Sequence, residues 1–280
     1  MKCVGFVKNK EQRNQQLPFY REKIREAIER DLIEDTNVVA IFYGGSIGTE
    51  ETDLFSDIDL RIVVKDELFE QYRRNKKIRA SYWGDVLFFE DVSWANYSSA
   101  HFRNFVKVDS FYYKVSDIKP SMWLQKIKIV KDSDAFLKRI VEQSQLLSYQ
   151  PTLSELEHWQ TKFYAHLHEA YRRTMRDEQF YALHCMDYLR LSVVAGWYME
   201  KGIQPNSSGD WAKIEGERSK LSSEQLSMLA IWHCNRDQNE ILRVMRSITS
   251  QFLSVQSKVC AKYGIDEDLK LTKEILDLVM

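Results

Sequence analysis

A glycine-rich turn between two apolar strands, followed by two closely spaced carboxylates, constrains this chain more than any other feature. Residues 38–43 form a continuous apolar run of β-branched and aromatic side chains, which predicts a buried central strand. A Gly-Gly-Ser turn follows at residues 44–46, and Asp57 and Asp59 open the next predicted strand. Because residues i and i+2 of a strand share a face, the two carboxylates point the same way.

Two carboxylates at this spacing repel each other unless a cation lies between them. Mg²⁺ is a simple choice of cation, because it binds carboxylates together with substrate phosphates. The backbone N–H groups of Gly44 and Gly45 can approach a phosphate closely, and Ser46 adds a hydroxyl donor. The pattern therefore indicates a metal and phosphate site rather than a solvated strand end.

A two-metal site of this kind usually needs a third carboxylate from a neighbouring strand. Asp109 is the preferred candidate, because it lies within a predicted strand over 105–113 and interrupts an apolar and aromatic run. Asp85, Glu90 and Asp91 are the alternatives.

Strand and helix patterns alternate in the first half of the chain and give way to helical patterns in the second. The first half predicts a helix from Pro18 to about Leu32 and strands over 38–43, 58–64, 86–89, 105–113 and 127–130. The hydrophobic period becomes helical after residues 132–134. We therefore expect an α+β protein with a mixed-sheet domain at 1–135 and a helical bundle at 136–280.

Capping and stop signals divide the second half into helices. A capping-box pattern at Thr152 and Glu155 predicts a helix to about Arg176. Further helices are expected over 178–201, from Asp210, from Ser223, over 237–263 and from Asp266, with a loop at 203–209.

The turn and the Asp-x-Asp strand together resemble the signature of the DNA polymerase β-like nucleotidyltransferase superfamily. The matching residues run from Tyr43 to Gly48 and from Ser56 to Leu60. A compact head followed by helices looks like the antibiotic nucleotidyltransferases within it, which modify aminoglycosides and lincosamides. The resemblance implies a Mg²⁺-dependent enzyme that transfers AMP from ATP to a hydroxyl of a small molecule, with a possible part in antibiotic resistance.

The same resemblance suggests two residues in the helical half. Glu169 matches a general base near the cleft between domains, and Arg190 could reach the triphosphate. The alternative for Glu169 is a surface ion pair with Arg172 or Arg173, at i+3 or i+4.

Aromatic residues are dense in the two helices predicted over 152–176 and 178–201. Most are expected in the bundle core, and some could line a drug-sized pocket. The candidates are Trp159, Phe163, Tyr164, Tyr171, Tyr181, Tyr188, Trp197 and Tyr198.

Composition narrows the remaining possibilities. The 280 residues carry a net charge of −1, so no polymeric nucleic acid is expected as a partner, and the basic run at 73–79 is interpreted as a solvated turn or helix end. Four separated cysteines without a CxxC favour a reducing compartment. Residues 1–7 are too short for a secretory signal and no run is long enough to span a membrane, so we expect a cytoplasmic protein.

A second functional hypothesis is a nucleotidyltransferase-like module that binds or AMP-modifies a protein partner, as antitoxin-type members of the superfamily do. Helical toxins that pair with such modules usually carry an Arg-x4–6-His motif. In the helical half, Arg176 and His184 are too far apart to form one.

Overall fold

The computed structural model describes residues 10–280 and divides into two compact units, one ending at Leu147 and the other beginning at Ser148. We call the first unit the head and the second the helical unit. The segment at residues 1–7, interpreted above as too short for a signal, lies outside the described residues, as does Cys3.

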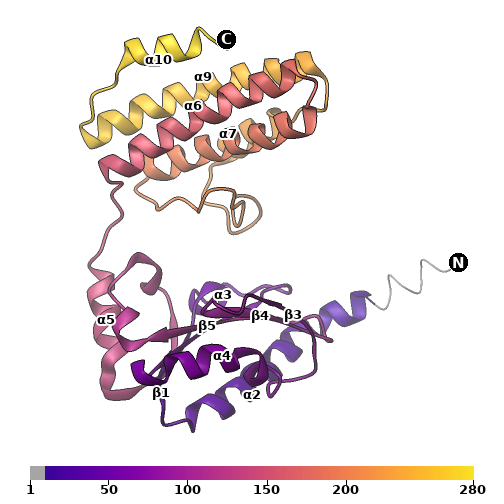
Figure 1. Cartoon of the computed structure of the whole chain (residues 1–280), viewed down its shortest axis with the longest axis vertical. Coiled ribbons are helices and arrows are strands. Elements are labelled where there is room, and N and C mark those ends of the chain that lie inside the picture. The colour runs from indigo at the N-terminus through magenta and orange to yellow at the C-terminus, as the bar shows by residue number, and fades with distance from the viewer. Residues whose placement is uncertain (1–9) are drawn as a thin grey trace, which may run out of the picture. The chain divides into compact units, whose positions relative to one another are not determined.

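Within residues 10–280, the head is built on a six-stranded sheet in the order β3-β4-β5-β2-β1-β6. Figure 1 labels β1, β3, β4 and β5 of this sheet. The β2–β5 pair is parallel, and the other neighbours are antiparallel. The strands are β1 (Val38–Tyr43), β2 (Ile58–Val64), β3 (Val86–Asp91), β4 (Tyr97–Phe102), β5 (Lys107–Lys114) and β6 (Lys128–Asp132). The helices of the head are α2 (Leu17–Ile33), α3 (Gly45–Gly48), α4 (Phe69–Ala80) and α5 (Phe136–Gln145), with short 3₁₀ turns η1 (Asp66–Leu68), η2 (Val115–Asp117), η3 (Met122–Leu124) and η4 (Ser133–Ala135).

The two faces of the sheet are covered by different helices. One face packs with α2 and α4 in a core that includes Ile28, Leu60 and Val108. The other face packs Phe42 and Val63 against Leu137 of α5. The alternation predicted for β2 is confirmed, because Ile58, Leu60 and Ile62 are buried while Asp59 and Arg61 turn to the other face and stay half-buried.

Two elements of the head were not predicted. β4 has the polar sequence Tyr-Ser-Ser-Ala-His-Phe, and it forms a strand because β3 and β5 pair with it on both sides. The helix α4 was not predicted either, and the basic run at 73–79, interpreted as a solvated turn or helix end, forms its C-terminal part. Lys76 of α4 is buried, and its ammonium donates to the carbonyls of Val92 and Ala95 at 2.7 and 2.6 Å.

The boundary between the units lies at Leu147, beyond the predicted position near residue 135. The segment between them is α5, which belongs to the head. Asp132 caps this helix, since its carboxylate accepts from the N–H groups of Leu137 and Lys138 at 2.7 and 2.9 Å. Leu137 is fully buried against the sheet, so hydrophobic packing attaches α5 to the head.

The helical unit is a bundle built around three long helices. Its core joins α6, α7 and α9, with rings such as Trp159 and Phe252 in contact at 4.8 Å between centroids. The helices of this unit are α6 (Leu153–Met175), α7 (Gln179–Glu200), α8 (Ser223–Ile231), α9 (Gln238–Tyr263) and α10 (Leu269–Leu276). The predicted α+β class, with a mixed sheet followed by helices, is confirmed.

Local signals explain most of the helix ends. Thr152 and Glu155 form the predicted capping box, and Gly264 ends α9 with φ +68° in the left-handed region. The helix predicted from Asp210 is wrong, because the chain runs through turns there until Ser223. Among the described helices, none has the length and apolar character that a membrane span requires.

Candidate functional site

The carboxylates predicted from the sequence lie close together near the N-terminal ends of the two central strands β2 and β5. Asp59 of β2 lies directly opposite Asp109 of β5 in the parallel pair. Asp57 comes immediately before β2, and the ammonium of Lys107 spans the gap to β5. Lys107 Nζ lies 2.9 Å from Asp57 Oδ2 and 2.9 Å from Asp109 Oδ2. The structure therefore brings all three acids into one cluster.

The Gly-Gly-Ser turn packs directly against this cluster. The N–H of Gly44 donates to the carbonyl of Asp59 at 2.9 Å. Gly45 has φ +53°, and a Cβ added to it would overlap Asp59 Oδ2. Only glycine combines this backbone conformation with so close an approach to a carboxylate. Ser46 is buried, and among the described residues its hydroxyl has no hydrogen-bond partner.

The cluster is electrostatically unbalanced in favour of negative charge around Asp59. Burial raises the pKa of Asp59, and the neighbouring charge of Asp57 raises it further. Arg61 opposes this shift, with Nη2 3.6 Å from Asp59 Oδ1. Burial alone would lower the pKa of Lys107, but its hydrogen bonds to Asp109 and Asp57 raise it instead. Asp109 Oδ1 is buried and has no hydrogen-bond partner within residues 10–280.

Two basic residues of the cluster, Lys107 and Arg61, were not predicted as site residues. Each lies two positions from an acid on the same strand, Lys107 before Asp109 and Arg61 after Asp59. The i, i+2 rule that paired the carboxylates also places these cations on the same face. Arg61 is fixed further by the ring of Phe111, 3.9 Å from its guanidinium carbon.

As the side chains stand, the described residues contain no group of three His, Cys, Asp or Glu side chains arranged to hold a metal ion. The Lys107 ammonium bridges two of the acids, Asp57 and Asp109. The donor set nevertheless has the right chemistry for Mg²⁺, since it consists of carboxylate oxygens on adjacent strands.

The alternative third acids have other partners in the head. Asp85 pairs with Arg103 at 2.9 Å, and Asp91 pairs with Lys76 at 3.0 Å. Glu90 contacts the ring nitrogen of a histidine on β4. Asp109 is the candidate that shares a partner, Lys107, with Asp57.

The two candidates of the helical half are engaged within their own unit. Glu169 lies on α6 and pairs with Arg173 and Arg172, and these contacts lower its pKa, Arg173 most strongly. This is the surface ion pair considered as the alternative from the sequence. Arg190 lies on α7 and donates to the carbonyl of Trp232 at 2.5 and 3.2 Å and to Asp187 at 2.7 Å.

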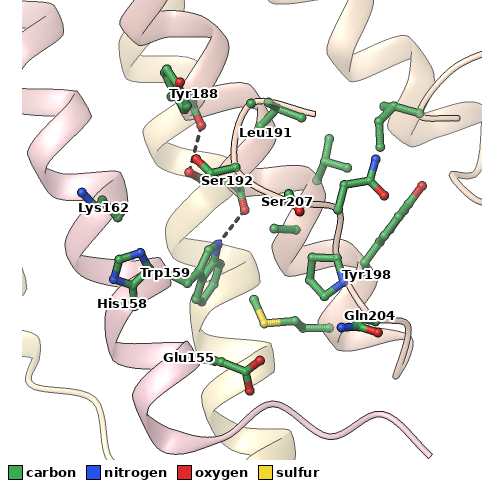
Figure 2. Close-up of a pocket in the computed structure, with 18 of the residues that line it drawn as sticks. Glu155, His158, Trp159, Lys162, Tyr188, Leu191, Ser192, Tyr198, Gln204 and Ser207 are labelled. Carbon is green, nitrogen blue, oxygen red and sulfur yellow. Dashed lines mark hydrogen bonds between the residues drawn. The ribbon is translucent and has the colours of Figure 1, made fainter. Parts of the chain in front are cut away.

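The helical unit contains a pocket of about 440 Å³ between α6, α7 and the loop over residues 204–209 (Figure 2). Three of the predicted aromatic candidates, Trp159, Tyr188 and Tyr198, line it. Trp159 Nε1 donates to the carbonyl of Ser192 at 2.7 Å, and the Ser192 hydroxyl donates to the carbonyl of Tyr188 at 2.9 Å, which fixes one wall. Phe163 and Trp197 are core residues instead.

Comparison with known proteins gives similarity in structure only. No protein-family model matches this chain, and no curated protein matches its sequence. An aminoglycoside 6-adenyltransferase from Bacillus subtilis is 15% identical, with 92% of this chain and 96% of that chain covered and a TM-score of 0.43. A nucleotidyltransferase-like protein from Exiguobacterium sibiricum is 12% identical, with 87% and 77% covered and a TM-score of 0.41.

Proposed function

We propose that this chain is a Mg²⁺-dependent nucleotidyltransferase that moves AMP from ATP to a hydroxyl group of a small molecule. The observation that carries the proposal is the cluster of Asp57, Asp59 and Asp109 beside the Gly-Gly-Ser turn. Carboxylates on adjacent strands are a donor set for Mg²⁺, and backbone N–H groups of a tight turn suit a phosphate. Hydroxyl-bearing antibiotics, such as aminoglycosides or lincosamides, are the acceptors that the sequence resemblance favours.

Three features of the cluster support a bound cation. Asp109 Oδ1 is buried without a hydrogen-bond partner in the described part of the chain. The pKa of Asp59 is raised by burial and by the charge of Asp57, so a nearby positive charge would stabilise its ionised form. Lys107 already places an ammonium between Asp57 and Asp109. Bound there by the three acids, Mg²⁺ would neutralise the phosphate charge that develops during transfer.

The proposed reaction is a displacement at the α-phosphorus of ATP. The acceptor oxygen forms a bond to this phosphorus, the bond to the pyrophosphate oxygen breaks, and pyrophosphate leaves with the electron pair. In this proposal a carboxylate near the reacting hydroxyl accepts its proton, and Asp109 is the candidate for this role within the head. The amide of Gly45 and the hydroxyl of Ser46 would hold the departing phosphates, while the amide of Gly44, which donates to the carbonyl of Asp59, fixes the turn beside them.

Glu169 and Arg190 stay as predictions for the base and for nucleotide binding. Glu169 would first have to separate from Arg173, whose hydrogen bond makes it a weaker base. Arg190 would have to release the carbonyl of Trp232. Asp109 needs no such rearrangement of its Oδ1.

The test is transfer of labelled AMP to a panel of hydroxyl-bearing small molecules and to total protein, scored by mass shift and by pyrophosphate release. We expect wild-type protein to label a small molecule only when Mg²⁺ is present. Asp57→Asn should abolish labelling and keep its thermal transition. The control is Asp177→Asn, which changes an acid outside the head in the same way and should retain activity.

Two outcomes would contradict the proposal. Near-normal pyrophosphate release by Asp57→Asn would contradict the proposed metal-binding role of the cluster. Labelling of protein alone, with no small molecule accepted, would favour the second hypothesis, a module that modifies a protein partner.

A further inference from the structure

The head contains a second feature that the proposed chemistry does not use, a pocket of about 540 Å³ that opens beside the carboxylate cluster. Asp57 and Lys107 form its polar end. Most of the remaining lining is apolar and includes Phe55, Phe88 and Phe105. A largely apolar cavity with a few polar groups at one end is typical of a small-molecule site.

The aromatic side chains of this pocket, which we call the phenylalanine pocket, are exposed to an unusual extent. Phe55, Phe88 and Phe105 are 62, 51 and 59% exposed. Exposed apolar side chains that gather in one place, rather than scattering over the surface, mark an interaction site. Burial of these rings by a ligand would therefore be favourable.

Neighbouring groups hold two of the rings in place. The ring of Phe88 stacks on that of His101, with 4.2 Å between centroids. Phe105 has φ +73°, which is rare for a bulky residue, and the Arg13 guanidinium lies 4.0 Å from its ring centroid. Residues held in sparsely populated backbone conformations cluster at ligand sites. The pocket thus presents preformed aromatic surfaces.

The order of the strands places this pocket and the glycine turn on opposite sides of the carboxylates. The turn follows β1, the acids lie on or next to β2 and β5, and Phe88 and His101 belong to β3 and β4. Because β1 pairs with β2 and β4 pairs with β5 in antiparallel fashion, the end of β1, the start of β2, the start of β5 and the end of β4 all lie on the same side of the sheet, where the strands end. At these strand ends the spatial order is the glycine turn, then the carboxylates, then the phenylalanine pocket.

This order gives the pocket a role in an in-line displacement. In such a reaction the attacking oxygen and the leaving group lie on opposite sides of the phosphorus. If the departing pyrophosphate lies at the Gly-Gly-Ser turn, the hydroxyl must approach from the side of the phenylalanine pocket. We propose that this pocket binds the acceptor, and that the acceptor carries an uncharged, ring-bearing apolar part next to its reacting hydroxyl. The assignment as acceptor rests on the function proposed above.

The lining of the pocket itself suits an uncharged group better than a polycation. Among residues 10–280, Asp57 is the carboxylate that lines the pocket, and the Lys107 ammonium lies 2.9 Å from it. Its other ionisable lining residue is His101, which contacts Glu90. A polycation would need several free carboxylates on the pocket walls, whereas an uncharged ring gains from burial against the apolar walls that are present.

The test is calorimetric binding to the full chain, in the presence of Mg²⁺ and α,β-methylene-ATP, whose α–β bond cannot be cleaved. The probes are 2-naphthylethanol, as an uncharged ring with a hydroxyl, and kanamycin, as a polycation. The variants are Phe88→Ser and the matched control Phe19→Ser, since Phe19 is 60% exposed on α2 and does not line the pocket. We expect Phe88→Ser to weaken naphthylethanol binding at least tenfold, Phe19→Ser to change it less than twofold, and kanamycin to bind far more weakly than naphthylethanol.

The outcomes separate this inference from the proposed function. Loss of nucleotide-analogue affinity in Phe88→Ser, with unchanged naphthylethanol binding, would assign the pocket to the nucleobase and overturn the inference. Equal naphthylethanol binding by wild type and Phe88→Ser would also overturn it. Naphthylethanol binding that depends on Phe88, in a chain that binds no nucleotide, would support a ring-binding pocket and reject both the proposed function and the acceptor role.

Discussion

Asp59 of β2 and Asp109 of β5 face each other across a parallel strand pair, at the same register position. This places two carboxylates side by side, and Asp57 adds a third through the shared contact with Lys107. Such an arrangement is unfavourable for a folded chain without a compensating cation. The clustered carboxylates therefore lower the stability of the head, and this effect can be measured.

Asp59→Asn should stabilise the metal-free head while removing activity. Since burial and the charge of Asp57 raise the pKa of Asp59, the folded state disfavours its ionised form. We expect a gain of about 1 kcal/mol in the free energy of unfolding at neutral pH, the scale of one like-charge contact in a well-solvated setting. Chemical denaturation in EDTA measures it.

The pH dependence of that gain follows from the sign of the shift. An acid whose folded pKa is raised binds protons more readily in the folded state. The wild type therefore loses stability relative to Asp59→Asn as the pH rises from the unfolded pKa through the folded pKa of Asp59. A difference between the two proteins that stays constant with pH would contradict the raised pKa.

Lys107→Met should destabilise the metal-free protein and increase its response to Mg²⁺. The change leaves Asp57 and Asp109 without their bridging ammonium, at a cost of about 1 kcal/mol. Differential scanning calorimetry with and without Mg²⁺ measures the effect. Lys114→Met, on the same strand but away from the acids, should leave the Mg²⁺ response unchanged.

Gly45→Ala should cost more stability than the same change at another left-handed glycine. Both Gly45 and Gly264 have positive φ, but a Cβ at Gly264 meets nothing within 4 Å, whereas one at Gly45 overlaps the Asp59 carboxylate. Both variants place alanine at a positive φ, so this backbone cost is common to the two. The difference between their losses in the free energy of unfolding therefore reports the overlap with Asp59, and it should be about 1–3 kcal/mol. Equal losses in urea titrations of the two variants would show that the turn does not press on Asp59.

Gly196→Ala should destabilise the helical unit, against the usual preference for alanine in a helix. Alanine normally gains about 1 kcal/mol over glycine at such a position. At Gly196 in α7, the new Cβ would overlap Val255 and lie 2.8 Å from Trp159 Cζ2. Overpacking by this amount costs about 1–3 kcal/mol, so the net change should be a loss. The double variant with Val255→Ala should recover part of it in thermal melts.

Strand periodicity predicted the part of the site that lies on single strands. The burial of Ile58 and Leu60, alternating with half-buried Asp59 and Arg61, follows from the strand period alone. The register that sets Asp59 opposite Asp109 depends on pairing between distant segments, so the sequence suggested Asp109 only from its position in an apolar run.

Tertiary contacts explain the elements that the sequence analysis missed. β4 carries buried Ser98, whose carbonyl accepts from the Ser110 hydroxyl at 3.2 Å, so a polar segment is stabilised by its two neighbouring strands. The apolar pocket beside Asp57 combines Phe55, Phe88 and Phe105 from separate loops and strands. The hydrophobic period within one segment does not show which distant segments come together in a pocket.

The parallel pairing of β2 with β5 also has a consequence for synthesis. α4 and the β3–β4 hairpin lie between the two strands in the chain, so a chain emerging from the ribosome has made Asp57 and Asp59 well before β5. Such non-local pairings form late, because closing the long intervening loop costs entropy before the contacts between the strands can compensate for it. The third carboxylate and its lysine thus arrive together on one strand, and a truncated or half-folded head lacks both at once.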